Sequence, residues 1–319
     1  MVGNYRQSGK TQFVLFLLFE ALMFAIEYPD AAKLKVFYFA LEETDERILH
    51  RFESYLLMKL DKIRISPRDL RSTDNSKPVP QEILNLLNSE KYQIYIRKFE
   101  ETFSFSNVAN PTGVYKMCKQ YAEETGKTYT KKYTAKNEFG EMQEYEGAFD
   151  YYVMDNPNEF RFVVLDHCGL IQPEKGMSIK ESIDKMSKYF VELRNRYNFS
   201  PILIQQQSTV NESNESFKLK AVRPSGRGLS DSSYTQRDAN TLLGLFSPFK
   251  FGIESFMEYD CKIFKDNIRF LEVCNSRDGQ VGGIIALFFD GVCNMFYELP
   301  KPNDPAINKW YEYIRTLNN

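Results

Sequence analysis

Glycine, lysine and threonine stand together near the start of the chain, as Gly9-Lys10-Thr11, directly before an apolar run with helical spacing. Glycine lets backbone N–H groups close on an anion, lysine reaches the anion's oxygens, and the threonine hydroxyl suits Mg²⁺. The dipole of a following helix favours negative charge at the same place. The pattern therefore predicts a phosphate-binding loop for a nucleotide. The residues expected to contact it are Gly3, Arg6, Ser8, Gly9, Lys10 and Thr11.

The spacing of this loop departs from the general motif G-x-x-x-x-G-K. That motif requires a glycine at position 4, where the chain has Asn4, and Gly3 stands one residue early. A chance solvent-exposed turn is the alternative interpretation of the loop.

An aspartate at the end of an apolar segment supports the first interpretation. The segment 160–167 reads FRFVVLDH and ends its apolar run at Asp166. P-loop ATPases hold Mg²⁺ with an acid at this kind of position. The alternative is a buried strand that merely ends in a surface aspartate. Together with Lys10 and Thr11, Asp166 predicts ATP and Mg²⁺ as the cofactors.

The elements that must position these residues follow an alternating pattern. Short apolar runs rich in β-forming residues predict strands at 36–41, 92–96, 162–166, 202–206, 241–246, 270–274, 284–289 and 294–298. Helical spacing predicts helices at 11–27, 44–60, 81–89, 111–125 and 178–198. Continuous apolar strands between helices are typical of an α/β fold with a mostly parallel central sheet. The last three strands follow one another closely, which predicts an antiparallel C-terminal addition.

Two segments break this pattern. Residues 127–147 predict an inserted hairpin with a turn near 137–140. Tyr129, Lys131, Lys132 and Tyr133 alternate aromatic and basic side chains, which could stack on or steer nucleic acid; a solvated surface hairpin is the alternative.

The polar stretch 208–230 is the second irregular segment. A loop of this length is usually functional or disordered. Cationic side chains along a loop can contact the backbone of single-stranded DNA. The candidate phosphate contacts are Lys218, Lys220, Arg223 and Arg227, with a solvated surface loop as the alternative.

Composition excludes several classes of protein. The 319 residues are 43% hydrophobic and 26% charged, which excludes a disordered chain, and the net charge of −2 gives no overall attraction to nucleic acid. Five cysteines and two histidines lack zinc-site spacing, so reduced cytosolic thiols and no structural metal are expected. The apolar run Phe13–Ile26 contains Glu20 and is short for a membrane span, so a buried helix is predicted.

Five segments in this order resemble the DnaB-type replicative hexameric helicases, which carry a RecA-like ATPase domain. The family has a wider glycine spacing in its phosphate loop, and Gly3–Thr11 follows it. Residues 37–51 (FYFALEETDERILHR) are similar to the family segment that implies Glu42 as the general base. The alternative is that Glu42 and Glu43 begin a helical turn.

The remaining segments extend the resemblance to about residue 289. Residues 165–171 (LDHCGLI) and 201–208 (PILIQQQS) are similar to the family's metal-binding and γ-phosphate-sensing segments, which implies Gln206 or Gln207 as the sensor. Residues 223–245 resemble the next segment, and 272–289 (EVCNSRDGQVGGIIALFF) resembles the last. The last segment implies Arg277 as an arginine finger; a hairpin turn beside a solvated arginine is the alternative.

The resemblance implies a RecA-like P-loop NTPase core and an ATP-dependent replicative DNA helicase motor. It implies a homo-hexameric ring with ATP between subunits, Arg277 acting in trans, and single-stranded DNA passing against 172–182 and 208–230. A primase or helicase loader is an implied partner, and the bacterial or phage-infected host cytoplasm the implied location, without a membrane. Residues 1–300 would form the motor and 301–319 a helical tail.

The chain also departs from the family pattern. The family's lysine two residues before the finger is Asn275 here, and only Met1 and Val2 precede Gly3, so the first strand of the fold is expected to be missing. A RecA-like or KaiC-like ATPase without unwinding activity therefore stays an alternative. A non-catalytic nucleotide-dependent scaffold or loader is the other.

Overall fold

One nine-stranded sheet organises the protein, whose computed structural model describes residues 2–4, 8–71, 78–206, 224 and 234–318. The strand order is β13-β12-β11-β8-β1-β7-β6-β2-β3. The strands are β1 Val2–Asn4, β2 Lys33–Ala40, β3 Phe103–Ser106, β6 Glu159–Asp166, β7 Phe199–Gln206, β8 Thr241–Phe246, β11 Ile268–Ser276, β12 Ile284–Asp290 and β13 Met295–Glu298.

The direction of the strands divides the sheet into two parts. From β3 to β8 neighbouring strands are parallel, whereas β11 is antiparallel to β8 and β12, and β12 is antiparallel to β13. The predicted α/β class, with a mostly parallel core and an antiparallel C-terminal addition, is confirmed. Parallel strands need cover on both faces of the sheet.

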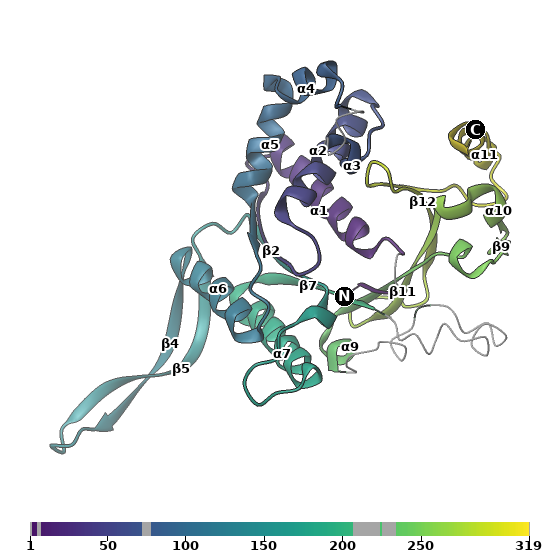
Figure 1. The fold of residues 1–319 in the computed structure, drawn as a ribbon. Helices are drawn as coiled ribbons and strands as arrows, with labels where there is room; N and C mark the ends of the chain where they lie inside the picture. Colours follow the sequence, from purple (N-terminus) through teal and green to yellow (C-terminus); the bar gives the residue numbers. More distant parts are fainter. Residues whose placement is uncertain (1, 5–7, 72–77, 207–223, 225–233, 319) are drawn as a thin grey trace.

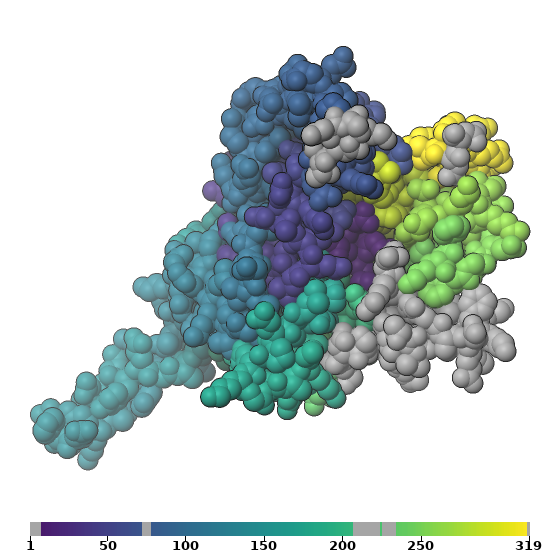
Figure 2. Space-filling model, in the orientation of Figure 1, coloured from purple at the N-terminus to yellow at the C-terminus, as the bar shows by residue number. Residues whose placement is uncertain are grey.

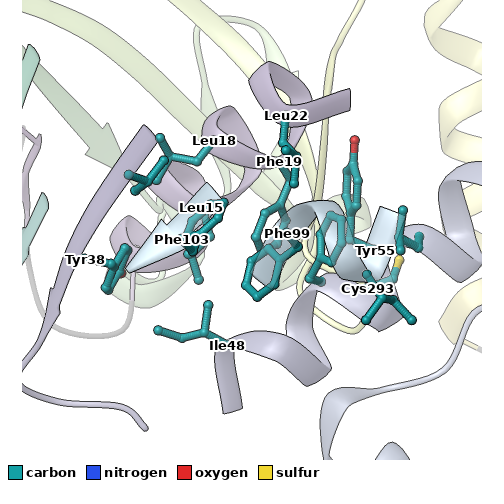
Figure 3. Close-up of a cluster of buried hydrophobic side chains, with 14 of the residues drawn as sticks. Leu15, Leu18, Phe19, Leu22, Tyr38, Ile48, Tyr55, Phe99, Phe103 and Cys293 are labelled. Carbon is teal, nitrogen blue, oxygen red and sulfur yellow. The ribbon is translucent and has the colours of Figure 1, made fainter. Parts of the chain in front are cut away.

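Helices supply that cover in two layers (Figure 1). Helices α1 Lys10–Glu27, α2 Asp45–Asp61, α4 Gln81–Leu87 and α5 Glu90–Thr102 share one core, and α6 Pro111–Glu124 and α7 Ile179–Tyr197 share the other. Successive side chains of a strand point to opposite faces. Val36 and Tyr38 of β2 accordingly enter the first core, shown in part in Figure 3, and Phe37 and Phe39 enter the second.

The apolar segment near the start of the chain forms the central helix of the first core. Its residues Leu15, Leu18 and Phe19 are buried against α2 and α5 (Figure 3). The Glu20 carboxylate accepts hydrogen bonds from Lys59 and from the hydroxyl of Tyr55, which satisfies the charge inside the apolar run. The prediction of a buried helix is confirmed. Among the helices of the described residues, none has the length and apolar composition to cross a membrane.

Two strand predictions were wrong. Residues 92–96 lie in helix α5, where Tyr92, Ile96 and Phe99 are buried at helical spacing, and the strand of this region is the later β3. A short apolar run cannot by itself distinguish a strand from a buried helix. The first strand of the fold, expected to be missing, is present as the three-residue β1, which pairs with β7 and β8.

A long hairpin projects from the body of the protein (Figures 1 and 2). Its strands, β4 Gly126–Lys136 and β5 Met142–Met154, pair with each other in antiparallel register and extend beyond the predicted 127–147. At the tip, the side chain of Asn137 accepts hydrogen bonds from the backbone of Phe139 and Glu141. Phe139 is 86% exposed there.

Shorter elements complete the fold. They are α3 Pro67–Leu70, α9 Tyr234–Asp238, α10 Cys261–Phe264, α11 Ile307–Asn318, the two-residue strands β9 Ser255–Phe256 and β10 Tyr259–Asp260, and the 3-10 turns at Cys168–Leu170, Phe249–Phe251 and Lys265–Asn267. Helix α11 lies within the expected C-terminal tail. Its residues Ile307 and Ile314 are buried with Phe264 and Phe288, so the segment packs on the antiparallel part of the protein.

Candidate nucleotide-binding site

The carboxyl ends of the parallel strands bring the predicted chemistry to one edge of the sheet. Strand β1 leads toward the glycine-rich loop, β2 ends before Glu42, and β6 ends at Asp166. The register pairs Ala40 with Asp166 and Asn4 with Gln206. Ligands of open α/β sheets bind at this edge. Residues far apart in sequence are therefore neighbours here.

The loop ends at the first turn of α1 with a conformation that suits glycine. Gly9 is the N-cap of α1 and has a φ of 88°, in the left-handed region, and its carbonyl accepts a hydrogen bond from the Phe13 amide. Lys10 follows as the first helical residue and is 7% exposed. Burial lowers the pKa of Lys10 to about 8, against the opposing effects of Asp166 and Glu42. A desolvated cation at a helix N-terminus is suited to a phosphate.

Thr11 and Asp166 meet beside this lysine. The Thr11 hydroxyl donates to Asp166 Oδ1 at 3.1 Å, and the Tyr38 hydroxyl donates to Oδ2 at 2.8 Å. Burial raises the pKa of Asp166 to about 6, although both hydrogen bonds act to lower it. A buried carboxylate next to a threonine hydroxyl is an oxygen donor set that fits Mg²⁺. The sequence did not single out Tyr38, although strand alternation places it on the face of Asp166.

The two neighbouring glutamates have different surroundings. Glu43 accepts two hydrogen bonds from Arg51, at 2.8 and 2.6 Å. The Glu42 side chain is 56% exposed, and its Oε2 lies 3.9 Å from Nε2 of His167. Both precede the N-cap Thr44, so the alternative in which they begin a helical turn was wrong. Of the pair, Glu42 is the carboxylate open to a water molecule.

His167 also contacts the predicted phosphate sensor. Its Nε2 lies 3.3 Å from Nε2 of Gln206, the last residue of β7. His167 therefore stands between Glu42 and Gln206, a role that the sequence did not suggest. The other predicted contacts Arg6, Gln207, Lys218, Lys220, Arg223 and Arg227 lie outside the described residues.

Arg277 lies at the opposite edge of the sheet. Strand β11 is antiparallel to β8, and its last residue, Ser276, pairs with Thr241 at the start of β8. The exposed Arg277 follows; its guanidinium donates to the carbonyl of Arg237, and its amide donates to that of Asn240 at 2.9 Å. The sheet thus separates Arg277 from Lys10 of the same chain. The turn interpretation also describes the local structure, because an exposed connection joins β11 to β12.

The segment 172–182, predicted to face DNA, is tied to two helices. Glu174 accepts hydrogen bonds from Lys185 at 2.5 Å and from the Thr112 amide at 2.8 Å. Hydrogen bonding from Lys185 is the main reason that the pKa of Glu174 falls to about 2. From Ile179 onward the segment is the first part of α7, capped by Ser178. The structure brings neither this segment nor the hairpin residues into the group around Lys10.

The aromatic and basic residues of the hairpin mainly contact one another. Tyr129 stacks on Tyr151 with ring centroids 4.5 Å apart, and Tyr133 stacks on Tyr145 at 5.8 Å. Lys132 forms an ion pair with Glu144 at 3.2 Å. Cross-strand pairs of this kind stabilise a hairpin. These contacts give the alternating residues a structural role.

Comparison with known proteins supports the fold. No known protein family and no curated protein matches the sequence. A DnaB-like replicative helicase, whose structure was described with its interactions with primase, matches with a TM-score of 0.63, 15% identity, and coverage of 94% of this chain and 57% of that chain. The ATPase domain of a second helicase matches with a TM-score of 0.58, 16% identity, and coverage of 94% of this chain and 84% of that domain.

These likenesses define the fold in two steps. The protein has a RecA-like P-loop ATPase fold, with its candidate site at the carboxyl edge of a parallel sheet. More narrowly, the fold is that of DnaB-like replicative helicases, as the resemblance predicted. The chain spans just over half of the first of these proteins.

Proposed function

We propose that this chain is the ATP-hydrolysing motor of a replicative DNA helicase. One observation carries the proposal: Lys10, Thr11 and Asp166 meet at one edge of the sheet, whereas the exposed Arg277 lies at the other. A site of this kind is completed by a second subunit. The likeness to DnaB-like helicases supports the proposal at the level of fold.

The residues of the first edge take roles that follow from their contacts. Lys10 and the loop amides bind the phosphates, and Thr11 and Asp166 hold Mg²⁺, which when bound polarises the phosphoryl oxygens. Glu42 accepts the proton of the attacking water, and Gln206 or Gln207 contacts the γ-phosphate.

Arg277 acts on the nucleotide of a neighbouring subunit. An arginine that stabilises the charge of a transferring phosphoryl group contributes roughly 10³ to 10⁵ in rate. A contact between two different faces of the same chain closes into a ring when the rotation fits. We therefore propose a homo-hexamer with ATP at its interfaces.

Single-stranded DNA is the proposed track of the motor. Cationic groups that follow the phosphate backbone bind it without reading sequence. The proposed contacts are Lys218, Lys220, Arg223 and Arg227. The proposed protein partner is a primase or a helicase loader, because the first similar helicase was described with a primase.

ATP turnover with and without single-stranded DNA tests this function, with Lys10→Ala as the blank. DNA-stimulated turnover that disappears in the blank, followed by strand displacement, is the expected result. Turnover that ignores DNA would indicate a RecA-like or KaiC-like ATPase. No turnover would indicate a nucleotide-dependent scaffold.

A further inference from the structure

We propose that Arg269 is a positioning residue for the nucleotide, which fixes the phosphate-binding loop from below and supplies buried positive charge there. Arg269 belongs to β11 and is 1% exposed. Its Nε donates to the Ser8 carbonyl at 2.8 Å, across 261 positions of sequence. The proposal rests on the proposed function, because it concerns the same loop.

The guanidinium holds the loop through a rigid frame. Its Nη1 donates to the carbonyls of Asp266 at 2.7 Å and Ile268 at 2.9 Å, both beside the start of β11. These bonds fix the plane of the fork, so its Nε–H has one direction, toward Ser8. The planar guanidinium is suited to such fixed geometry, unlike the flexible ammonium of lysine.

An aromatic ring completes the support of the loop. The Arg269 guanidinium carbon lies 4.6 Å from the ring centroid of Phe289, a contact of the cation–π type. The same ring lies under Gly9, where an added Cβ would meet it at 3.4 Å. Arg269 and Phe289 therefore contact consecutive residues of the loop, Ser8 and Gly9, directly before Lys10.

The charge of Arg269 is only partly compensated. The carboxylate that contacts it is Asp266, at 2.9 Å, whose side chain is 65% exposed. Burial lowers the pKa of Arg269, the direction expected when desolvation outweighs the nearby negative charge. A buried cation with weak compensation favours an anion placed near it. The polyphosphate of a nucleotide is the anion that this loop is built to hold.

A second buried arginine provides a matched control. Arg161 lies in β6, is fully buried, and pairs with Glu159 at 2.5 Å. It also donates to the Tyr152 hydroxyl and the Thr125 carbonyl at the root of the hairpin. Replacement of either arginine removes the same side chain from the interior of the same sheet, but only Arg269 contacts the loop.

The experiment compares four variants of the full chain: Arg269→Lys, Arg269→Leu, Arg161→Leu and Lys10→Ala. Thermal unfolding reports stability, and titration with a fluorescent ATP analogue, in competition with ATP and with inorganic tripolyphosphate, reports affinity. A lost charge-assisted hydrogen bond corresponds to about tenfold or more in Kd. We expect the Kd of ATP and of tripolyphosphate to rise by about tenfold in Arg269→Lys, and by more in Arg269→Leu.

The outcomes separate this inference from the proposed function. Arg161→Leu should lower the unfolding temperature and leave both Kd values unchanged. Unchanged Kd values in Arg269→Lys would overturn the inference, and this variant decides the matter if Arg269→Leu does not fold. A shift for ATP but not for tripolyphosphate would also overturn it, because the effect would then lie outside the phosphates. If Lys10→Ala keeps full affinity, the proposed function fails instead.

Discussion

The phosphate-binding loop and the β4–β5 hairpin are each held at the base by a buried arginine, but the two arginines have different neighbours. Arg161, below the hairpin, pairs with the mostly buried Glu159. Burial acts to lower the pKa of Arg161, but its hydrogen bonds to Tyr152 and Glu159 raise that pKa overall. Arg269, below the loop, donates mainly to backbone carbonyls, and burial lowers its pKa.

This difference distinguishes a structural arginine from one that serves a ligand. A buried ion pair that is locally complete has little left to offer another group. The cation below the loop keeps a field that an incoming anion can use. The hairpin projects from the body, whereas the loop starts the central helix of the first core (Figures 1 and 2). The same side chain thus anchors a projecting element in one place and prepares a binding site in the other.

The largest effect should come from the edge that neither arginine supports. Arg277→Ala should lower ATP turnover by about a thousandfold or more, because it removes the proposed finger from each site. Mixing it with Glu42→Gln should restore part of the turnover, since some interfaces then contain a native Glu42 and a native Arg277. Turnover is measured over a series of mixing ratios. No recovery at any ratio would contradict action in trans.

Removal of the structural arginine should affect stability and not nucleotide affinity. Arg161→Leu leaves Glu159 without its buried partner, which should lower the free energy of unfolding by about 3–5 kcal/mol. Urea denaturation measures this loss, and ATP titration of the folded fraction should match that of the native protein. Arg161→Lys, which keeps the charge, should lose less. A weaker ATP affinity in Arg161→Leu would erase the distinction between the two arginines.

A smaller effect is expected at the carboxylate beside the loop. Tyr38→Phe removes the hydroxyl that donates to Asp166 at 2.8 Å, and the loss of one buried hydrogen bond should cost about 1–3 kcal/mol of stability. The Mg²⁺ concentration needed for half-maximal ATP turnover should also change, because Asp166 loses a group that orients it. Tyr129→Phe in the hairpin is the control and should alter neither quantity.

The smallest effect is expected from shortening the hairpin. Thr130 and Phe149 are paired across the strands, so residues 131–148 can be replaced by an Asn-Gly turn between them. The unfolding temperature and ATP turnover should stay close to those of the native protein, because the contacts of Arg161 at the root are kept. DNA affinity is measured on the same variant. A marked loss would show that Tyr133 and its neighbours contact nucleic acid.

The sequence by itself determined the local part of this protein. Gly9-Lys10-Thr11 before a helix and Asp166 after an apolar strand carry their chemistry in a few consecutive residues. The order of the parallel and antiparallel strands followed from apolar runs and the distances between them. The run 92–96 was the exception, because five residues contain less than two helical turns and its partners in the core were unknown.

The tertiary structure alone decided which distant residues support the site. Tyr38 meets Asp166 across 128 positions, and Arg269 meets Ser8 across 261. Neither contact leaves a periodic pattern in the sequence. The opposite placement of Lys10 and Arg277 likewise depends on the antiparallel direction of β11. Strand register and desolvation are properties of the folded sheet, and they decide which buried charges are compensated and which remain for a ligand.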